Sequence, residues 1–425
     1  MSVLEKMTTK DAIALEDQYG AHNYHPLPVV LSRGEGVFVW DAEGKKYYDF
    51  LSAYSAVNQG HCHPKIVGAM VNQAQTLTLT SRAFYNDVLG TFEKYATETF
   101  KFDKLLPMNT GAEAVETALK LCRKWAYEKK GIPENEAKII VCENNFHGRT
   151  TTIISFSNDP VARKHFGPFT EGFIKIEYDN LRALENALEH NTDVAGFLVE
   201  PIQGEAGVYV PSEGYLKKAR ELCEKHNVLF IADEVQTGIA RTGRLLATCG
   251  NCSCTDKHCS GTPEVKPDIL ILGKALSGGA YPVSAVLAND DIMEVIKPGN
   301  HGSTFGGNPI AAAVGIAALD VVKDEELANN AYELGELFRS ELNKFIPRTP
   351  LVNAVRGKGL LNAILINDTE DSSTAWDICM ALKENGLLAK PTHGNIIRFA
   401  PPLIMTKDQL LDCIAIIIRT LQEFK

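Results

Sequence analysis

The sequence has no apolar run long enough to cross a bilayer, which takes about 20 consecutive apolar residues. It also has no excess of positive charge: 43 lysines and arginines stand against 53 aspartates and glutamates, a net charge of −10. That balance argues against nucleic acid or an anionic membrane as a main partner. The start, MSVLEKMTTKDAIALEDQYG, is neither an apolar signal sequence nor an acid-poor, arginine-rich transit peptide. We therefore expect a cytosolic protein.

The chain has 425 residues, of which 45% are hydrophobic and 23% charged, as in ordinary soluble proteins. From about residue 138, apolar runs alternate with helical patterns, which predicts an α/β fold with a mostly parallel sheet covered by helices on both faces. The length is sufficient for two domains. We expect an N-terminal arm (residues 1–50), a large domain (51–315) and a smaller α+β C-terminal domain (316–425).

Two of the apolar runs end in side chains suited to catalysis. The run ILIL is followed by Gly273 and Lys274. Desolvation favours the neutral amine of such a lysine, which can attack an aldehyde to form a Schiff base. The run VLFIA ends at Asp233, where a carboxylate can hold a ligand such as the ring nitrogen of pyridoxal phosphate. Taken singly, a lysine that caps a strand and an aspartate that ends one are equally ordinary readings.

A third signal lies earlier in the chain. Thr110 and Glu113 form a T-x-x-E capping box that predicts a helix start. The small residues Gly111 and Ala112 leave the first backbone amides open to an anion such as phosphate. Since loops that follow parallel strands meet at one edge of a sheet, these signals predict one site and therefore an enzyme. Four loops contribute to that edge: residues 146–149, 200–205, 233–236 and Lys274.

Long motifs throughout the chain then point to a family. They include FLSAYSAVNQGHCHPK, LPMNTGAEA, VEPIQGEAG, IADEVQTGIARTGR, HGSTFGGNP and LLAKPTHGNIIRFAPP. With these motifs the chain resembles the class III aminotransferases, which are fold-type-I enzymes, and within them the ornithine aminotransferases. The resemblance implies an aspartate-aminotransferase-like fold and pyridoxal 5′-phosphate as the cofactor.

The resemblance also implies which residues hold the cofactor. Lys274 would bind it covalently and move the proton, while Asp233 would pair with the ring nitrogen. Ser303 and Thr304 would reach the cofactor phosphate of a neighbouring subunit, so a homodimer or a higher assembly is implied. The remaining cofactor contacts are Phe146 on the ring, Gln236 near the ring oxygen, and Thr110, Gly111 and Ala112 at the phosphate.

For the substrates, the resemblance implies L-ornithine as donor and 2-oxoglutarate as acceptor. Arg149 would clamp the α-carboxylate of the donor, and Tyr24 would contact its α-amino group. Glu205 would mask Arg398 until the second carboxylate of the oxo acid arrives; alternatively the two form only a structural ion pair. Acetylornithine or 4-aminobutyrate are the alternative donors. A different class of function is that of a non-catalytic scaffold protein. Lys274 and Asp233 argue against it, because a scaffold needs neither residue.

Two features depart from the family pattern. His147 occupies a position where relatives can carry another aromatic residue, and we assign it no role. A cysteine-rich insert could bind zinc, form a disulfide, or carry free thiols. Its cysteines are Cys249, Cys252, Cys254 and Cys259.

Overall fold

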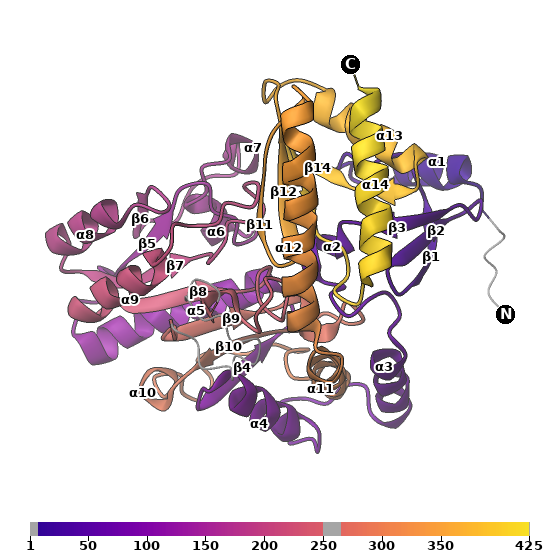
Figure 1. Cartoon of the computed structure of the whole chain (residues 1–425). Coiled ribbons are helices and arrows are strands. Elements are labelled where there is room, and N and C mark those ends of the chain that lie inside the picture. The colour runs from indigo at the N-terminus through magenta and orange to yellow at the C-terminus, as the bar shows by residue number, and fades with distance from the viewer. Residues whose placement is uncertain (1–6, 250–264, 425) are drawn as a thin grey trace.

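The computed structural model describes residues 7–249 and 265–424, and its central element is a seven-stranded sheet (Figure 1). Five neighbouring strands are parallel, and β10 runs antiparallel to both of its neighbours. This confirms the predicted α/β fold with a mostly parallel sheet. In spatial order the strands are β4 (Lys104–Met108), β10 (Ser284–Ala288), β9 (Ile269–Leu272), β8 (Leu229–Asp233), β7 (Val194–Val199), β5 (Lys138–Cys142) and β6 (Phe173–Ile176).

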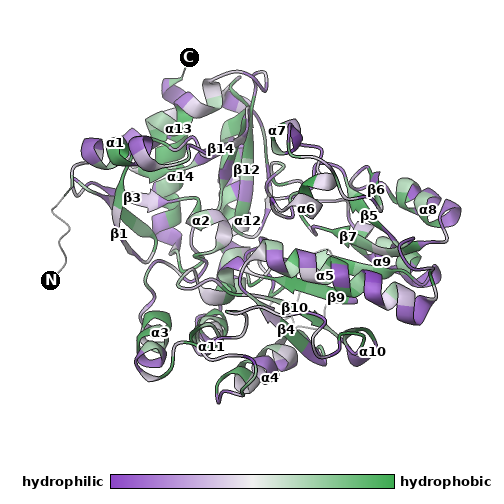
Figure 2. Ribbon diagram, turned by 180° about the vertical axis from the view of Figure 1, so that it is seen from behind, coloured by the Kyte–Doolittle hydropathy of each residue, from purple (hydrophilic) through white to green (hydrophobic). Residues whose placement is uncertain are grey.

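Helices cover both faces of this sheet, as Figure 2 shows. Successive side chains of a strand point to opposite faces. In β5, Ile139 and Val141 belong to the core under α5 and α10, whereas Ile140 and Cys142 belong to the core under α8 and α9. Because both faces are buried, the central strands β7 and β9 consist of unbroken apolar runs, whereas the edge strand β6 contains the exposed Lys175. The helices are α5 (Gly111–Trp125), α8 (Leu181–His190), α9 (Tyr215–Lys225) and α10 (Asp290–Met293).

The start of α5 is fixed by the predicted capping box. The Thr110 hydroxyl accepts from the backbone N–H of Glu113 at 3.2 Å, and the Glu113 carboxylate accepts from the N–H of Thr110 at 2.9 Å. Strands β4 and β9 are both antiparallel to β10, so β4, β9 and β8 point the same way. The start of α5 therefore lies at the edge where β8 and β9 end.

The C-terminal part forms a second sheet with three long helices (Figure 1). The order of its strands is β11 (Val352–Lys358), β12 (Leu361–Ile366), β15 (Ile396–Phe399) and β14 (Lys390–His393). The helix α11 (Pro309–Asp324) leads into this part and runs through residue 315 without a break, so the domain boundaries stay predictions. The helices that pack here are α12 (Leu327–Phe345), α13 (Thr374–Glu384) and α14 (Lys407–Glu423).

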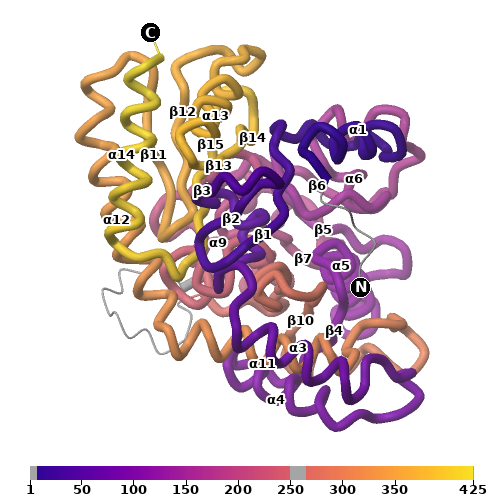
Figure 3. The backbone as a smooth tube through the Cα atoms, turned by 90° about the vertical axis from the view of Figure 1, so that its right-hand side faces the viewer, coloured from indigo at the N-terminus to yellow at the C-terminus, as the bar shows by residue number. Residues whose placement is uncertain are grey.

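The N-terminal part packs against the C-terminal part (Figure 3). Its hairpin turns at Gly44, and β3 pairs in parallel with the short C-terminal strand β13 (Leu387–Leu388). Of the helices that the structure describes, none has the length and apolar character to cross a membrane. The N-terminal elements are α1 (Thr9–Tyr19), β1 (Leu31–Glu35), β2 (Phe38–Asp41), β3 (Lys46–Asp49), α2 (Ser52–Ser55), α3 (Pro64–Thr76) and α4 (Leu89–Phe100).

The predicted metal or disulfide site of the cysteine insert lies outside the described residues. This applies to Cys252, Cys254, Cys259 and the side chain of Cys249. The insert follows the turn η2 (Ala247–Cys249), whose first two backbone N–H groups donate to the buried carboxylate of Glu234 at 3.0 and 2.8 Å. Two short helices near the central sheet complete the fold: α6 (Thr151–Ser155) and α7 (Pro160–Arg163).

Candidate active site

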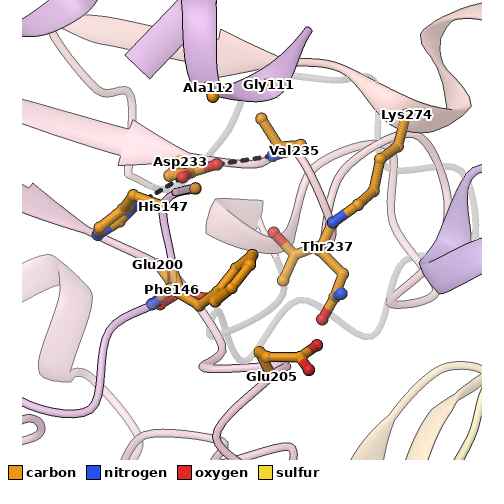
Figure 4. Close-up of a pocket in the computed structure, with 12 residues that line it drawn as sticks. Gly111, Ala112, Phe146, His147, Glu200, Glu205, Asp233, Val235, Thr237 and Lys274 are labelled. Carbon is orange, nitrogen blue, oxygen red and sulfur yellow. Dashed lines mark hydrogen bonds and ion pairs between the residues drawn. The ribbon is translucent and has the colours of Figure 1, made fainter. Parts of the chain in front are cut away.

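A cavity of about 190 Å³ lies at the edge of the central sheet where β7, β8 and β9 end (Figure 4). The loops predicted to meet at this edge do meet there. The side chain of Lys274 extends into the cavity from one side, and Asp233 lies on the other. The residues that line it are Gly111, Ala112, Phe146, His147, Gly148, Glu200, Glu205, Asp233, Val235, Gln236, Thr237 and Lys274.

Asp233, the last residue of β8, is buried and held at both carboxylate oxygens. Its Oδ1 accepts from the N–H of Val235 at 3.0 Å, and its Oδ2 accepts from Nδ1 of His147 at 2.6 Å. Burial opposes protonation of His147, but the hydrogen bond and charge of Asp233 outweigh it and raise the pKa of the imidazole. His147 therefore fixes the orientation of Asp233. We had assigned His147 no role, and nothing in its spacing from Asp233, 86 residues away, indicates this contact.

Lys274 follows β9 and begins the short turn η3 (Lys274–Ser277) with a left-handed backbone, φ +44°. Burial lowers the pKa of its ammonium group, against the opposing charge of Asp233; the nearby guanidinium of Arg398 lowers it as well. A lower pKa increases the fraction of neutral amine. This is the form that a nucleophile or a proton acceptor requires.

Glu200 is a second buried carboxylic acid beside the cavity, directly after β7. Its Oε1 accepts from the N–H of Phe146 at 2.8 Å. Burial raises its pKa to about 7, although the charge of His147 acts in the opposite direction. Glu200 can therefore hold or release a proton near neutral pH. The sequence analysis predicts that Glu200 lies on a loop at the site, but it assigns the residue no role.

The cavity floor fits a phosphorylated ring cofactor. The first amides of α5, at Gly111 and Ala112, have no partner one turn earlier in the helix and lie at the positive end of its dipole. Gly148 has φ +133°, and a Cβ there would lie 2.9 Å from the Cβ of Ala112, so only glycine allows this approach. The Oε1 of Gln236 is buried without a hydrogen-bond partner among the described residues and is available to a ligand.

Glu205, which lines the cavity, forms an ion pair with Arg398 behind it, with a distance of 2.9 Å between Oε2 and Nη1. The Arg398 side chain is 3% exposed and that of Glu205 33%. Burial would raise the pKa of Glu205, but the charge of Arg398 lowers it below its ordinary value. Since one partner reaches solvent, the pair can open toward the cavity more readily than one that is buried on both sides.

Tyr54 lies next to this pair and was missed in the sequence. Its ring centroid is 5.3 Å from Cζ of Arg398. The residues 52–55 of α2 all have positive φ, between +46° and +71°, which costs about 1–2 kcal/mol per residue. Asp49 stabilises this turn, because its Oδ1 accepts from the N–H groups of Leu51 and Ser52. The segment contains no glycine, so no sequence signal announced a left-handed turn.

A wider cavity of about 370 Å³ adjoins the first and shares Phe146, His147, Gly148 and Glu205 with it. Arg149 lines this outer cavity; it is exposed, with Nη2 3.7 Å from Oδ2 of Asp159 and Cζ 5.7 Å from the centre of the Phe146 ring. The structure thus places an exposed cation, only loosely paired with Asp159, at the entrance.

Besides Arg398, four other predicted residues line neither cavity. Tyr24 is 70% exposed, and Thr304 is exposed as well. Ser303 is half-buried, and its hydroxyl accepts from the side-chain amide of Asn109 at 2.8 Å. Thr110 caps α5 from outside the cavity. Their roles toward cofactor and substrate stay predictions.

The chain is similar to known aminotransferases along nearly its whole length. A curated ornithine aminotransferase of Drosophila ananassae is 62% identical over 413 residues, 97% of this chain and 91% of that protein. A solved structure described as acetylornithine aminotransferase from Elizabethkingia anophelis is 65% identical, with a TM-score of 0.88 over 98% of this chain and 100% of that one. An ornithine aminotransferase structure from Toxoplasma gondii is 50% identical, with a TM-score of 0.92 over 99% and 95% of the two chains.

The same comparison corrects the predicted location. The Drosophila ananassae protein and three further curated relatives are named as mitochondrial. The prediction of a cytosolic protein is therefore wrong. It rested on the composition of the first 20 residues and on the lack of a long apolar run, and neither excludes a mitochondrial protein.

The model of the class III aminotransferase family matches residues 19–421. Pyridoxal 5′-phosphate is the cofactor of this family, and the Toxoplasma gondii structure is described as having partial occupancy of it at the active site. The cavity of the present chain has the amine, the anion and the helix N-terminus that such a cofactor needs. This chain belongs to the class III aminotransferases and is a pyridoxal-phosphate-dependent enzyme of fold type I.

Proposed function

We propose that this enzyme transfers the δ-amino group of L-ornithine to 2-oxoglutarate. The products are L-glutamate and glutamate 5-semialdehyde, which cyclises to pyrroline-5-carboxylate. The donor leaves before the acceptor binds, so one cavity serves two substrates of different charge. The observation that carries the proposal is the Glu205–Arg398 pair, in which Glu205 lines the cavity and covers Arg398, because it can present a neutral or a cationic surface to the substrate. The similarity to curated ornithine aminotransferases supports the choice of donor.

Lys274 and the groups around it supply the proton chemistry. When bound, pyridoxal phosphate supplies an aldehyde carbon for the amine and a ring that withdraws electrons from the reacting carbon. The α5 amides would hold its phosphate, and Asp233, oriented by His147, would hold its ring nitrogen. The amine of Lys274, with its lowered pKa, takes the proton from the δ-carbon of the donor and returns it later.

The donor must enter with its δ-amine first, because ornithine also carries an α-amine. Arg149 at the entrance would bind the α-carboxylate, and Tyr24 would contact the α-amino group. These contacts hold the α-end of the donor at the outer cavity and leave its δ-amine, which carries no carboxylate beside it, for the inner one. Glu205 covers Arg398 during this half-reaction and so removes a cation that would attract a carboxylate instead.

The acceptor carries a second carboxylate that requires a cation. When Glu205 turns away, Arg398 is left buried and unpaired, and a carboxylate is the ligand that best satisfies it. Thr304 is exposed, and Phe305 beside it is 51% exposed. Because an exposed apolar side chain can mark a contact surface, this supports a homodimer in which residues 303–304 reach the cofactor of the partner subunit.

Replacement of Glu205 by alanine tests the switch. With the mask removed, we expect the ratio of kcat/KM for L-ornithine to that for L-glutamate to fall about tenfold or more. The measurement is steady-state kinetics with each donor. If the pair is only structural, Glu205→Ala lowers the thermal stability and both activities together and leaves this ratio unchanged.

N-acetylornithine is the second candidate donor, because the Elizabethkingia anophelis structure is described as an acetylornithine aminotransferase. The two donors differ at the α-nitrogen, which is a cation in ornithine and a neutral amide in the acetylated form. A panel of L-ornithine, N-acetylornithine and 4-aminobutyrate decides the question by kcat/KM. A higher value for N-acetylornithine than for L-ornithine would replace the proposed donor.

A further inference from the structure

The segment from Gly20 to Pro28 joins α1 to β1 and carries Tyr24. Its residues are exposed except for Leu27, and Tyr24 itself is 70% exposed. Packing therefore does little to fix the phenol ring. Contacts of the neighbouring backbone must determine where this ring lies.

Two side chains from the far end of the sequence hold the residue next to Tyr24. The Nζ of Lys390, at the start of β14, donates to the carbonyl oxygen of His25 at 2.8 Å. The ring of Trp376, in α13, lies 4.6 Å from the His25 imidazole, centroid to centroid. Figures 1 and 3 show the N-terminal region beside α13 and β14. Both contacts bridge more than 300 residues of sequence.

Strand β14, which contacts this segment through Lys390, also contacts the Glu205–Arg398 pair. Lys390 is the direct cross-strand partner of Arg398 in the β14–β15 pair. Two residues along β14, the hydroxyl of Thr392 donates to the backbone carbonyl of Glu205. A single short hairpin thus contacts the Tyr24 segment and the Glu205 loop and lines part of the outer cavity.

We propose that Lys390 is a positioning residue for donor selection: by holding the carbonyl of His25 it keeps Tyr24 where its ring can contact the α-amino group of the donor. Trp376 supports the same residue from the other side. This inference rests on the proposed function of Tyr24 toward an ornithine-like donor. Lys390 acts through Tyr24 and does not itself touch the reacting atoms.

The neighbouring Lys383 shows why Lys390 is the specific anchor and provides a matched control. Lys383 donates to the carbonyl of Pro28 in the same segment, at the longer distance of 3.4 Å, and its Nζ lies 3.0 Å from the carboxylate of Glu384. Among the described residues no carboxylate forms an ion pair with Lys390, although the charge of Glu205 is near enough to act on it. The two lysines therefore contact one segment at different distances from Tyr24.

The test uses the full-length holoenzyme and three variants, Lys390→Met, Lys390→Arg and Lys383→Met. For Lys390→Met we expect KM for L-ornithine to rise about threefold, no more than the loss of Tyr24 itself would cause, with kcat and the KM for 2-oxoglutarate within error of wild type. Lys390→Arg, which can still donate to the carbonyl, restores most of the loss. Lys383→Met behaves as wild type. Equal effects on both substrates, or the same effect in Lys383→Met, would assign Lys390 a merely structural role and overturn the proposal.

Limited proteolysis with chymotrypsin gives a readout that does not depend on turnover. In Lys390→Met we expect faster cleavage after Tyr24 than in wild type and in Lys383→Met. An unchanged cleavage rate contradicts the anchor even if the kinetics change. If wild type shows no turnover of L-ornithine, the proposed function fails; faster cleavage would then still establish the anchor without its role in donor selection.

Discussion

The inner and the outer end of the active site are built in different ways. At the inner end, Asp233, His147 and Glu200 lie at or next to ends of parallel strands, are buried, and bond to one another or to backbone amides. At the outer end, Tyr24 and Arg149 are exposed and lie on segments without regular structure. Burial and hydrogen bonds therefore fix the inner side chains in position, whereas the exposed outer side chains are less constrained.

This difference assigns proton transfer to the inner end of the site and recognition of the substrate to the outer end. A proton transfer requires reacting atoms within a few tenths of an ångström of their positions, which strand ends in a packed core provide. Recognition of the α-end of a substrate tolerates more movement, and loops change more readily than a core. We therefore expect inner substitutions to alter kcat or stability and outer ones to alter KM.

Replacement of Lys274 by alanine should have the largest effect. The variant lacks the amine that moves the proton at the substrate carbon, so kcat should fall by at least about 10³-fold. Thermal stability should stay the same or rise, because a desolvated cation has been removed. Steady-state turnover and thermal unfolding measure both. A kcat within tenfold of wild type would show that another group moves the proton.

Replacement of Glu200 by glutamine should change the pH dependence of stability. Burial raises the pKa of Glu200 from 4.5 to about 7, so between these values the folded state keeps a proton that the unfolded state loses. The contribution of Glu200 to stability therefore falls as pH rises from 4.5 to 7, by up to about 3 kcal/mol, and stays low above 7. Glutamine can still accept from the N–H of Phe146 and does not titrate.

Urea unfolding at pH 5 and pH 8 tests this prediction. The variant should gain stability relative to wild type at pH 8, and the gain should shrink at pH 5. A difference between the two proteins that is the same at both pH values would mean that Glu200 is ionised throughout, and that the inner end is more polar than its burial indicates.

His147 should matter less than Lys274, because it acts through Asp233. His147→Phe removes the donor to Oδ2 of Asp233 and should lower kcat about tenfold. His147→Gln is the matched control, since its amide can still donate, and it should retain more activity. Equal kcat in wild type and both variants would show that the N–H of Val235 alone orients the carboxylate.

The sequence predicted the groups whose signals are local. Lys274 and Asp233 end apolar runs, and the Thr110–Glu113 box marks a helix start, so each can be read from a few residues. The contact between His147 and Asp233, the left-handed turn at Tyr54 and the pairing of β13 with β3 could not be read in this way. Each depends on residues brought together by the whole fold, and tertiary packing overrides local preference there.

Tyr24 should give the smallest effect and the sharpest test of the difference between the two ends. Because its side chain is 70% exposed, Tyr24→Ala should leave thermal stability and kcat within error of wild type. KM for L-ornithine should rise about three- to fivefold, as for one weak polar contact. KM for 4-aminobutyrate, which has no α-amino group, should not change. A fall in kcat as large as that of His147→Phe would mean that the outer end also orders the reacting atoms, and chemistry and selection would then share one rigid unit.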